Sequence, residues 1–330
     1  MNDPRAIDGV LVQWGDRLFY PGNRRVPTSL GRGGAGLRDR AAVIRQRIER
    51  TVARAPQVMV KVTGGGRGMA AIAAHLRYIS KNGRMPMEDD QGNQREGKEA
   101  MLDVAEQWRL GGSRIPEKSE RREAFNIMLS MPRGTDPLIV QRAARDFAQT
   151  ELANHRYVMV LHDHQANPHV HLSVRAESRQ GKRLNPRKAD LQRWREVFAE
   201  RLRGWGIEAE ATRQITRGEQ RNYPRLWRKK ASEQGRVQAP GATNKSVQRF
   251  SNSHKQALEA WLRIKDALTK SSEPADRQLG NAMDLHIRTM PFAIEIMRRW
   301  KAKQQLELPG VQVVKAPVVA RSRPGPEMER

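Results

Sequence analysis

Four of the eight histidines of the chain lie in one short segment, LHDHQANPHVHLS, at 161–173. Residues two apart on a β-strand point to the same face, so His169 and His171 project together while Val170 points into the core. His162 ends the preceding predicted strand, and a short turn can bring it beside this pair. Three imidazoles converging from adjacent strands predict a metal site with open positions for substrate oxygens. A run of surface histidines, or of histidines satisfied within the core, is the alternative.

A second candidate for chemistry is Tyr78, in the stretch HLRYISKNG. The chain has only four tyrosines, so few phenols are available as nucleophiles. A phenol has a pKa of about 10 and needs a base or a neighbouring positive charge to attack at neutral pH. Arg77 and Lys81 place cations nearby. Spacing alone favours Tyr78 as a packing residue of a helix, with a nucleophile as the alternative.

The elements that must position these residues follow from hydrophobic periodicity. Alternation predicts half-buried strands, and a spacing of three to four residues predicts helices. Strands that alternate with helices without βαβ regularity predict an α+β fold with a central antiparallel sheet covered by helices on one face, followed by a mainly helical C-terminal region. The predicted strands are 57–63, 125–131, 157–161 and 169–174, the predicted helices are 69–81, 99–110, 138–153 and one that starts at 185–186, and 84–98 is predicted to be a loop.

The composition restricts the function further. With 61 Lys and Arg against 36 Asp and Glu, the formal net charge is +25. Such an excess indicates a polyanionic partner, for which nucleic acid is the first expectation and an anionic membrane surface the alternative. No apolar run approaches the roughly 20 residues that span a bilayer, and the N-terminus has no signal-peptide core, which predicts a cytoplasmic, bacterial-type protein without membrane insertion. The absence of cysteine excludes disulfides, thiolate metal sites and cysteine nucleophiles.

Three motifs in this order resemble those of relaxases, the plasmid mobilisation and conjugation nucleases of the HUH (His-hydrophobic-His) endonuclease superfamily. The resemblance covers about 56–228 and is strongest to the subfamily that nicks the transferred-DNA borders of tumour-inducing plasmids. HLRYISKNG resembles the first motif, which implies that Tyr78 is the nucleophile. SMPRGTD at 130–136 resembles the second, which helps to hold DNA near the cut. HDHQANPHVHL resembles the third, which implies that its metal ligands are His162, His169 and His171.

The chain departs from the relaxase pattern at two positions. The acidic residue that usually follows the first histidine by two positions is His164 here, and an asparagine often found four residues after the last histidine is Arg175. We therefore consider Asp163 and Asp136 as the candidates for a carboxylate that orients a histidine. Imidazole ligands favour Mn²⁺ or Zn²⁺ over Mg²⁺ by softness, whereas the resemblance implies Mg²⁺ or Mn²⁺.

The resemblance implies site- and strand-specific nicking of single-stranded origin-of-transfer DNA with a 5′-phosphotyrosyl intermediate. It also implies relaxosome accessory proteins and a type IV secretion coupling protein as partners. The alternatives are a non-catalytic DNA-binding accessory protein of a mobile element and a rolling-circle replication initiator. In the initiators the tyrosine usually follows the histidine motif, where this chain has Tyr223 in a basic stretch. The residues predicted to bind DNA are Arg77, Lys81, Ser130, Thr135, Arg225, Arg228, Lys229 and Lys230.

These expectations divide the chain into five parts. They are a basic N-terminal extension at 1–55, a relaxase domain at 56–212, a basic linker at 213–243, a helical region at 244–307 and a disordered tail at 308–330. The extension is predicted to contain a short helix near 40–53, and the helical region two long helices at 245–270 and 274–305. Eight Lys or Arg residues lie in 213–236 beside Tyr223 and Trp227, a composition suited to gripping phosphates and stacking bases. A solvated basic linker without such a role is the alternative.

Overall fold

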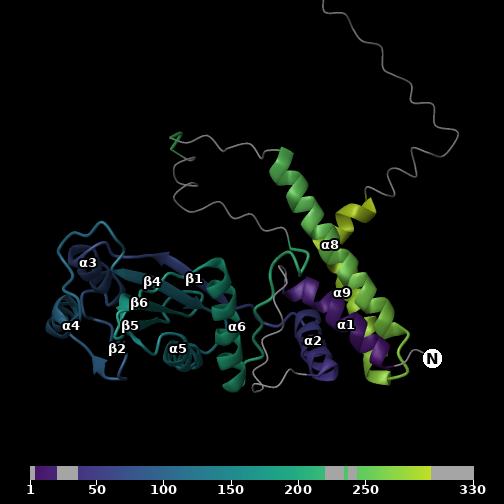
Figure 1. The fold of residues 1–330 in the computed structure, drawn as a ribbon, viewed down its shortest axis with the longest axis horizontal. Helices are drawn as coiled ribbons and strands as arrows, with labels where there is room; N and C mark the ends of the chain where they lie inside the picture. Colours follow the sequence, from purple (N-terminus) through teal and green to yellow (C-terminus); the bar gives the residue numbers. More distant parts are fainter. Residues whose placement is uncertain (1–3, 21–35, 220–233, 237–243, 299–330) are drawn as a thin grey trace, which may run out of the picture.

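Six antiparallel strands form one sheet in the described structure (Figure 1). The computed structural model describes residues 4–20, 36–219, 234–236 and 244–298. The strand order is β1-β4-β6-β5-β2-β3, which places the two strands that carry the histidines side by side within the sheet. The strands are β1 (Met59–Gly64), β2 (Met87–Asp89), β3 (Gln94–Arg95), β4 (Ala124–Ser130), β5 (His155–His162) and β6 (His169–Ser178).

Helices cover both faces of the sheet. On one face lie α5 (Pro137–Glu151) and α6 (Lys188–Gly204), where the Phe147 ring meets the Trp194 ring edge-on at a centroid distance of 6.0 Å. On the other face lie α3 (Met69–Ile79) and α4 (Lys98–Leu110).

The predicted α+β class is confirmed, but the expectation of helices on one face alone was wrong. The run from Tyr157 to Leu161 is apolar at every position, and such a strand requires cover on both sides. Tyr157 and Met159 belong to the core under α5 and α6, whereas Val158 and Val160 belong to the core under α3 and α4. The predicted loop at 84–98 contains the short hairpin of β2 and β3, which pairs with β5.

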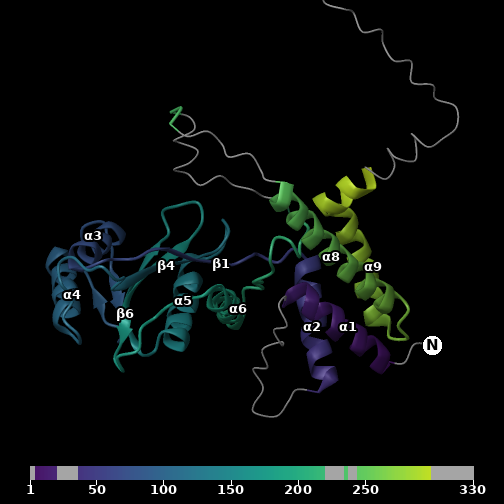
Figure 2. The same cartoon turned by 45° about the horizontal axis from the view of Figure 1, so that its top comes forward.

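A third hydrophobic core lies beside the sheet and is built from both ends of the described chain (Figures 1 and 2). Its helices are α1 (Pro4–Phe19), α2 (Leu37–Val52), α8 (Asn244–Thr269) and α9 (Pro274–Thr289). Trp261 of α8 is fully buried, and its ring meets that of Phe19 edge-on. A Cβ atom at Gly15 would lie 2.5 Å from Cγ2 of Ile44, so glycine permits the close contact of α1 with α2. We call these four helices the helical lobe.

The N-terminal segment is therefore not the separate extension that its composition suggested. Ile7, Leu11, Trp14 and Leu18 follow one another at helical spacing and point into the lobe. The glycine-rich stretch that follows them obscured this pattern. At the other end, the predicted helix over 274–305 is interrupted, because α9 ends before Pro291, whose ring cannot continue a helix, and a further helix covers 291–298. The predicted tail, and most of the basic linker, lie outside the described residues.

The lobe joins the sheet domain through a buried ion cluster. The Glu210 carboxylate accepts hydrogen bonds from Nε of Arg47 at 3.2 Å and from Nε of Arg50 at 2.9 Å, and both arginines lie on α2. Glu210 is anchored to the start of the sheet domain, because its backbone N–H donates to the carbonyl of Pro56. None of the described helices is long and apolar enough to cross a bilayer.

We expect Glu210→Gln to destabilise the junction by about 3–5 kcal/mol, the usual cost of removing one charge from a buried pair. Burial alone would raise the pKa of Glu210, but Arg47 and Arg50 outweigh it and hold the pKa below its usual range. The stabilisation is thus fully present above the unfolded pKa of about 4.3 and is lost as the pH falls through the folded value. Urea unfolding at pH 7 and in acid measures both effects. A Glu210→Gln variant as stable as the wild type at pH 7 would contradict this prediction.

Candidate active site

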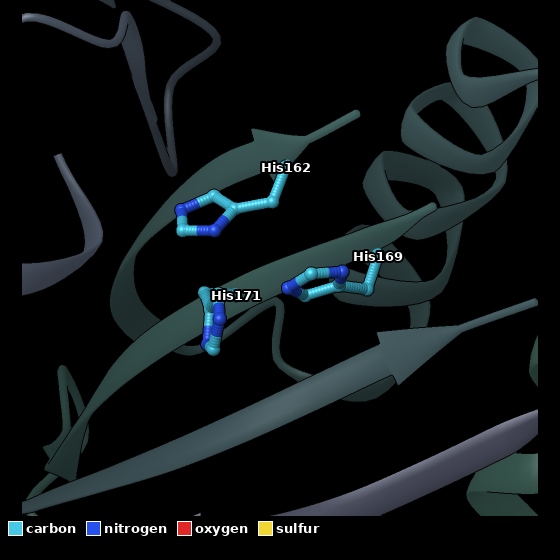
Figure 3. Close-up of side chains that lie close together, drawn as sticks. All are labelled: His162, His169 and His171. Carbon is cyan, nitrogen blue, oxygen red and sulfur yellow. The ribbon is translucent and has the colours of Figure 1, made fainter. Parts of the chain in front are cut away.

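The histidine triad is built by the pairing of β5 with β6. His162 and His169 are directly opposite each other in this antiparallel pair, and His171 is opposite Val160. Residues two apart share a face, so His169 and His171 both point to the α3 side, while Val170 points into the core under α5 and α6. Figure 3 shows the three imidazoles converging from the two strands. The structure thus brings together all three histidines that the sequence predicted.

The triad has the size and chemistry of a metal site. The ring centroids are 4.7 to 5.1 Å apart, and one ring nitrogen of each histidine lies within 4.8 Å of the others. All three side chains are buried. Burial is the largest influence that lowers the pKa of His171, to about 3, and it also lowers the pKa of His162. At neutral pH these two rings are therefore uncharged, which is the form that binds a metal ion.

Backbone carbonyl groups orient two of the three rings. Nε2 of His162 donates to the carbonyl of Ile79 at 2.8 Å, and Nδ1 of His169 donates to the carbonyl of Asn167 at 3.0 Å. Because a carbonyl can only accept, these bonds leave Nδ1 of His162 and Nε2 of His169 with free lone pairs. Nδ1 of His171 is buried without a hydrogen-bond partner. A buried ring nitrogen without a hydrogen-bond partner, in a cluster with two nitrogens that have free lone pairs, fits a site for a metal ion.

Tyr78 lies at the edge of the triad. It is on the last turn of α3, its side chain is 69% exposed, and its ring centroid is 6.4 Å from that of His171. The following residue, Ile79, supplies the carbonyl that orients His162. This carbonyl is available because the carbonyl groups in the last turn of a helix have no N–H donor within the helix. One helix end therefore places the phenol and also fixes a ring of the triad.

Sequence reasoning missed His75, one turn before Tyr78 on α3. Its ring is stacked against Tyr78 at a centroid distance of 6.3 Å and meets His171 edge-on at 6.4 Å. Burial lowers its pKa to about 4. The spacing of three residues on a helix was the signal that could have identified it, because such pairs are neighbours on the helix surface.

The two candidate carboxylates do not orient the rings through hydrogen bonds in the described structure. Asp136 is the N-cap of α5, and its side chain accepts from the backbone N–H of Leu138 at 2.8 Å. Asp163 is exposed just beyond the end of β5. Among the described residues neither carboxylate makes a hydrogen bond to a histidine of the triad. His164 is also exposed, with its ring centroid 5.2 Å from that of His162.

The predicted DNA-binding residues fall into three groups. Arg77 and Lys81 are exposed at the end of α3, and the charge of Lys81 contributes to lowering the pKa of His162, after burial and the neighbouring histidines. Ser130 is buried opposite His169 on β4, and its hydroxyl donates to the carbonyl of Pro168. Thr135 donates to the carbonyl of Pro132 within the turn before α5. The other four, Arg225, Arg228, Lys229 and Lys230, lie outside the described residues.

Arg175, at the position where relaxases often have asparagine, has a structural role. Its buried guanidinium donates to the carbonyls of Trp108, Gly111 and Ser113, where α4 ends. Several carbonyl dipoles around one cation offset part of the cost of burying it.

An antiparallel sheet that carries a His-hydrophobic-His pair, a third histidine on the neighbouring strand and a tyrosine at their edge is the arrangement expected of a nuclease domain of the HUH superfamily. Residues 78–207 match the family model of the MobA/VirD2-like relaxase nuclease domain, so this part of the chain is similar to the DNA-nicking relaxases. The match begins at Tyr78, whereas the sheet begins at β1, so the folded domain extends beyond the match. No curated protein matches the chain.

Proposed function

We propose that the chain nicks one strand of origin-of-transfer DNA in a conjugative or mobilisable element, with Tyr78 as the nucleophile. The observation that carries this proposal is the position of Tyr78 beside the triad. Of the tyrosines that the structure describes, Tyr20 and Tyr157 are buried in separate hydrophobic cores, whereas Tyr78 is exposed next to His171. The rolling-circle alternative requires Tyr223, which lies outside the described residues.

In the proposed reaction, the Tyr78 oxygen forms a bond to the scissile phosphorus, and the bond between phosphorus and the 3′ oxygen breaks. The phenol proton passes to solvent, and the departing 3′ oxygen takes up a proton. The products are a 5′-phosphotyrosyl link and a free 3′-hydroxyl, and the reverse attack of that hydroxyl reseals the strand without a nucleotide cofactor. His162, His169 and His171 would hold a divalent ion, Mg²⁺ or Mn²⁺, which supplies positive charge against the nonbridging phosphate oxygens.

The test is a cleavage screen with single-stranded oligonucleotides that tile the DNA flanking the gene. The full chain is incubated with each oligonucleotide and Mn²⁺ or Mg²⁺, and the products are separated under denaturing conditions. We expect a covalent adduct that contains the fragment downstream of the cut, and an upstream fragment that a polymerase can extend. Binding without any adduct would favour the non-catalytic accessory protein.

Arg77, Lys81, Ser130 and Thr135 are proposed to hold the strand near the cut. Lys81 is the best supported of the four, because it is exposed beside His162 and carries a positive charge. Relaxosome proteins and a type IV secretion coupling protein are the proposed partners, and the cytoplasm of a bacterial cell is the proposed location.

The basic segment 213–236 is proposed to supply affinity and not the choice of cut site, because phosphate contacts do not read bases. We expect neutralisation of Arg225, Arg228, Lys229 and Lys230 to flatten the salt dependence of single-strand binding by up to about 0.7 in log–log slope per lost contact. Titrations across a range of salt measure the slope, and mapping of the product ends measures the cut position. An unchanged slope would identify the segment as a bystander, and a moved cut would place it in the recognition surface.

A further inference from the structure

The phenol of Tyr78 has no polar anchor within the described structure. Its side chain is 69% exposed, and its hydroxyl makes no hydrogen bond among the described residues. Side chains on a helix lean back over the preceding turn, so the Tyr78 ring lies over the positions three and four residues earlier. These positions hold His75 and Ala74. Because alanine presents only a methyl group, His75 is the one of the two that can support a flat ring.

The rings of His75, Tyr78 and His171 pack against one another. His75 is stacked on Tyr78, with a centroid distance of 6.3 Å and an angle of 28° between the ring planes. His171 meets each of the other two rings edge-on, in both cases at a centroid distance of 6.4 Å. These distances lie in the range of roughly 4.5–7 Å at which aromatic pairs attract each other. His75 therefore contacts both the proposed nucleophile and a proposed metal ligand.

His75 is held more firmly than the ring that it supports. Its neighbours Ile72, Leu76 and Ile79 on α3 are buried in the core between this helix and the sheet. His75 is half-buried, and its Nε2 is buried without a hydrogen-bond partner in the described structure. One edge of the imidazole is thus inserted into the protein. Because the nitrogen lone pairs lie in the ring plane, the stacked face offers Tyr78 a packing surface and not a hydrogen bond.

We propose that His75 is a positioning residue for strand nicking, whose ring holds the Tyr78 phenol at the edge of the triad in the orientation for attack. The inference rests on the proposed role of Tyr78 as the nucleophile. An exposed phenol without such support would occupy several rotamers, and only some of them would present its oxygen to the scissile phosphate. A reacting group misplaced by about 1 Å can lower a rate by about 100-fold. His75 would thus affect the rate of attack and not the binding of DNA or metal.

Two substitutions separate the flat ring of His75 from its nitrogens. His75→Phe keeps a flat ring and removes both nitrogens, whereas His75→Ala removes the ring. Alanine has the highest helix propensity, so His75→Ala does not weaken the backbone of α3. His286→Ala is the matched control, because His286 is also a half-buried helical histidine and burial lowers the pKa of both residues to about 4. His286 lies on α9 in the helical lobe and outside the triad.

The first test measures adduct formation in a single turnover, with the full-length protein, Mn²⁺ and a saturating concentration of the oligonucleotide that is cut. We expect His75→Ala to form the adduct about 100-fold more slowly than the wild type, the loss expected for a misplaced reacting group. His75→Phe and His286→Ala should form it at near the wild-type rate. Mn²⁺ affinity, and oligonucleotide affinity without metal, should stay near the wild type in all three variants, because His75 is not one of the triad ligands.

The second test observes the orientation of Tyr78 and needs no cleavage. The chain has four tyrosines, so labelling with ¹³C-tyrosine gives few NMR signals, and the signal lost in Tyr78→Phe belongs to Tyr78. Neighbouring rings displace this signal from its position in free tyrosine. We expect the signal to move toward the free position in His75→Ala and to stay displaced in the wild type and in His75→Phe.

Several results would overturn the inference. A wild-type rate or an unchanged Tyr78 signal in His75→Ala would show that the phenol does not depend on His75. If His75→Phe is as slow as His75→Ala, a ring nitrogen acts and not the flat face. A parallel loss of Mn²⁺ affinity in His75→Ala, or an equally slow His286→Ala, would contradict a positioning role as well. Absence of any adduct in the wild type would refute the proposed function instead, and the NMR signal would still decide whether His75 holds Tyr78.

Discussion

Tyr78→Phe is expected to abolish the covalent DNA adduct and strand nicking while single-strand binding stays within about twofold of the wild type. The substitution removes only the attacking oxygen. Because the Tyr78 side chain is 69% exposed and its hydroxyl makes no hydrogen bond among the described residues, the fold does not depend on that oxygen. Surface changes of this kind usually alter stability by less than about 0.5 kcal/mol. Denaturing gels of protein and labelled oligonucleotide report the adduct, and anisotropy reports binding.

Tyr223→Phe is the matched control, because it makes the same chemical change at the tyrosine downstream of the histidines. We expect this variant to form the adduct at the wild-type level. Persistence of the adduct in Tyr78→Phe, together with its loss in Tyr223→Phe, would reverse the assignment. The order of tyrosine and histidines would then be that of a rolling-circle initiator.

The second large effect is expected at the triad. His169→Ala and His171→Ala should each weaken divalent metal binding by more than about 100-fold, since loss of even an outer-shell partner typically costs roughly 10- to 100-fold. Each change leaves two of three imidazoles around the ion. Calorimetric titration with Mn²⁺ measures the affinity. Chelation should stop cleavage by the wild type, and Mn²⁺ or Mg²⁺ should restore it.

His164→Ala is the control for this series. Its ring lies 5.2 Å from that of His162, yet it is exposed and outside the converging cluster. We expect its metal affinity to remain near that of the wild type, whereas His162→Ala should lose affinity like the other two. An equal loss in His164→Ala and His162→Ala would show that the wrong upstream ligand has been assigned.

Much of the sheet domain could be predicted from local patterns. Apolar runs located β1, β4, β5 and β6 to within a few residues, because each strand carries several apolar residues that pack into the cores beside the sheet. The spacing of His169 and His171 also fixed their common face. The pairing that brings His162 opposite His169 followed from the short connection between the two strands.

The rest depended on contacts between distant parts of the chain. No pattern in the sequence shows that the carbonyl of Ile79 meets His162, because the two residues are brought together only when α3 packs on the sheet. The sequence suggested a carboxylate as the group that orients a histidine, whereas backbone carbonyl groups have this role for His162 and His169. The strands β2 and β3 are only three and two residues long, too short for alternation to be visible. Likewise, the apolar stripe of α1 packs in one core with α8 and α9, which lie more than 200 residues later in the sequence, so its partners could not be predicted from the local pattern.

The construction of one core from both ends of the described chain determines the order of events during synthesis. Every buried residue of the two cores that flank the sheet lies between Val58 and Ala211, so these cores can close while the ribosome is still translating the lobe. The apolar faces of α1 and α2 emerge first but remain uncovered until α9 has been made. At about 5–20 residues per second, the roughly 80 residues beyond Ala211 take several seconds. A chain whose synthesis stops before α8 would thus keep a folded sheet domain but expose the apolar faces of α1 and α2. Chaperones and proteases recognise such exposed apolar surfaces.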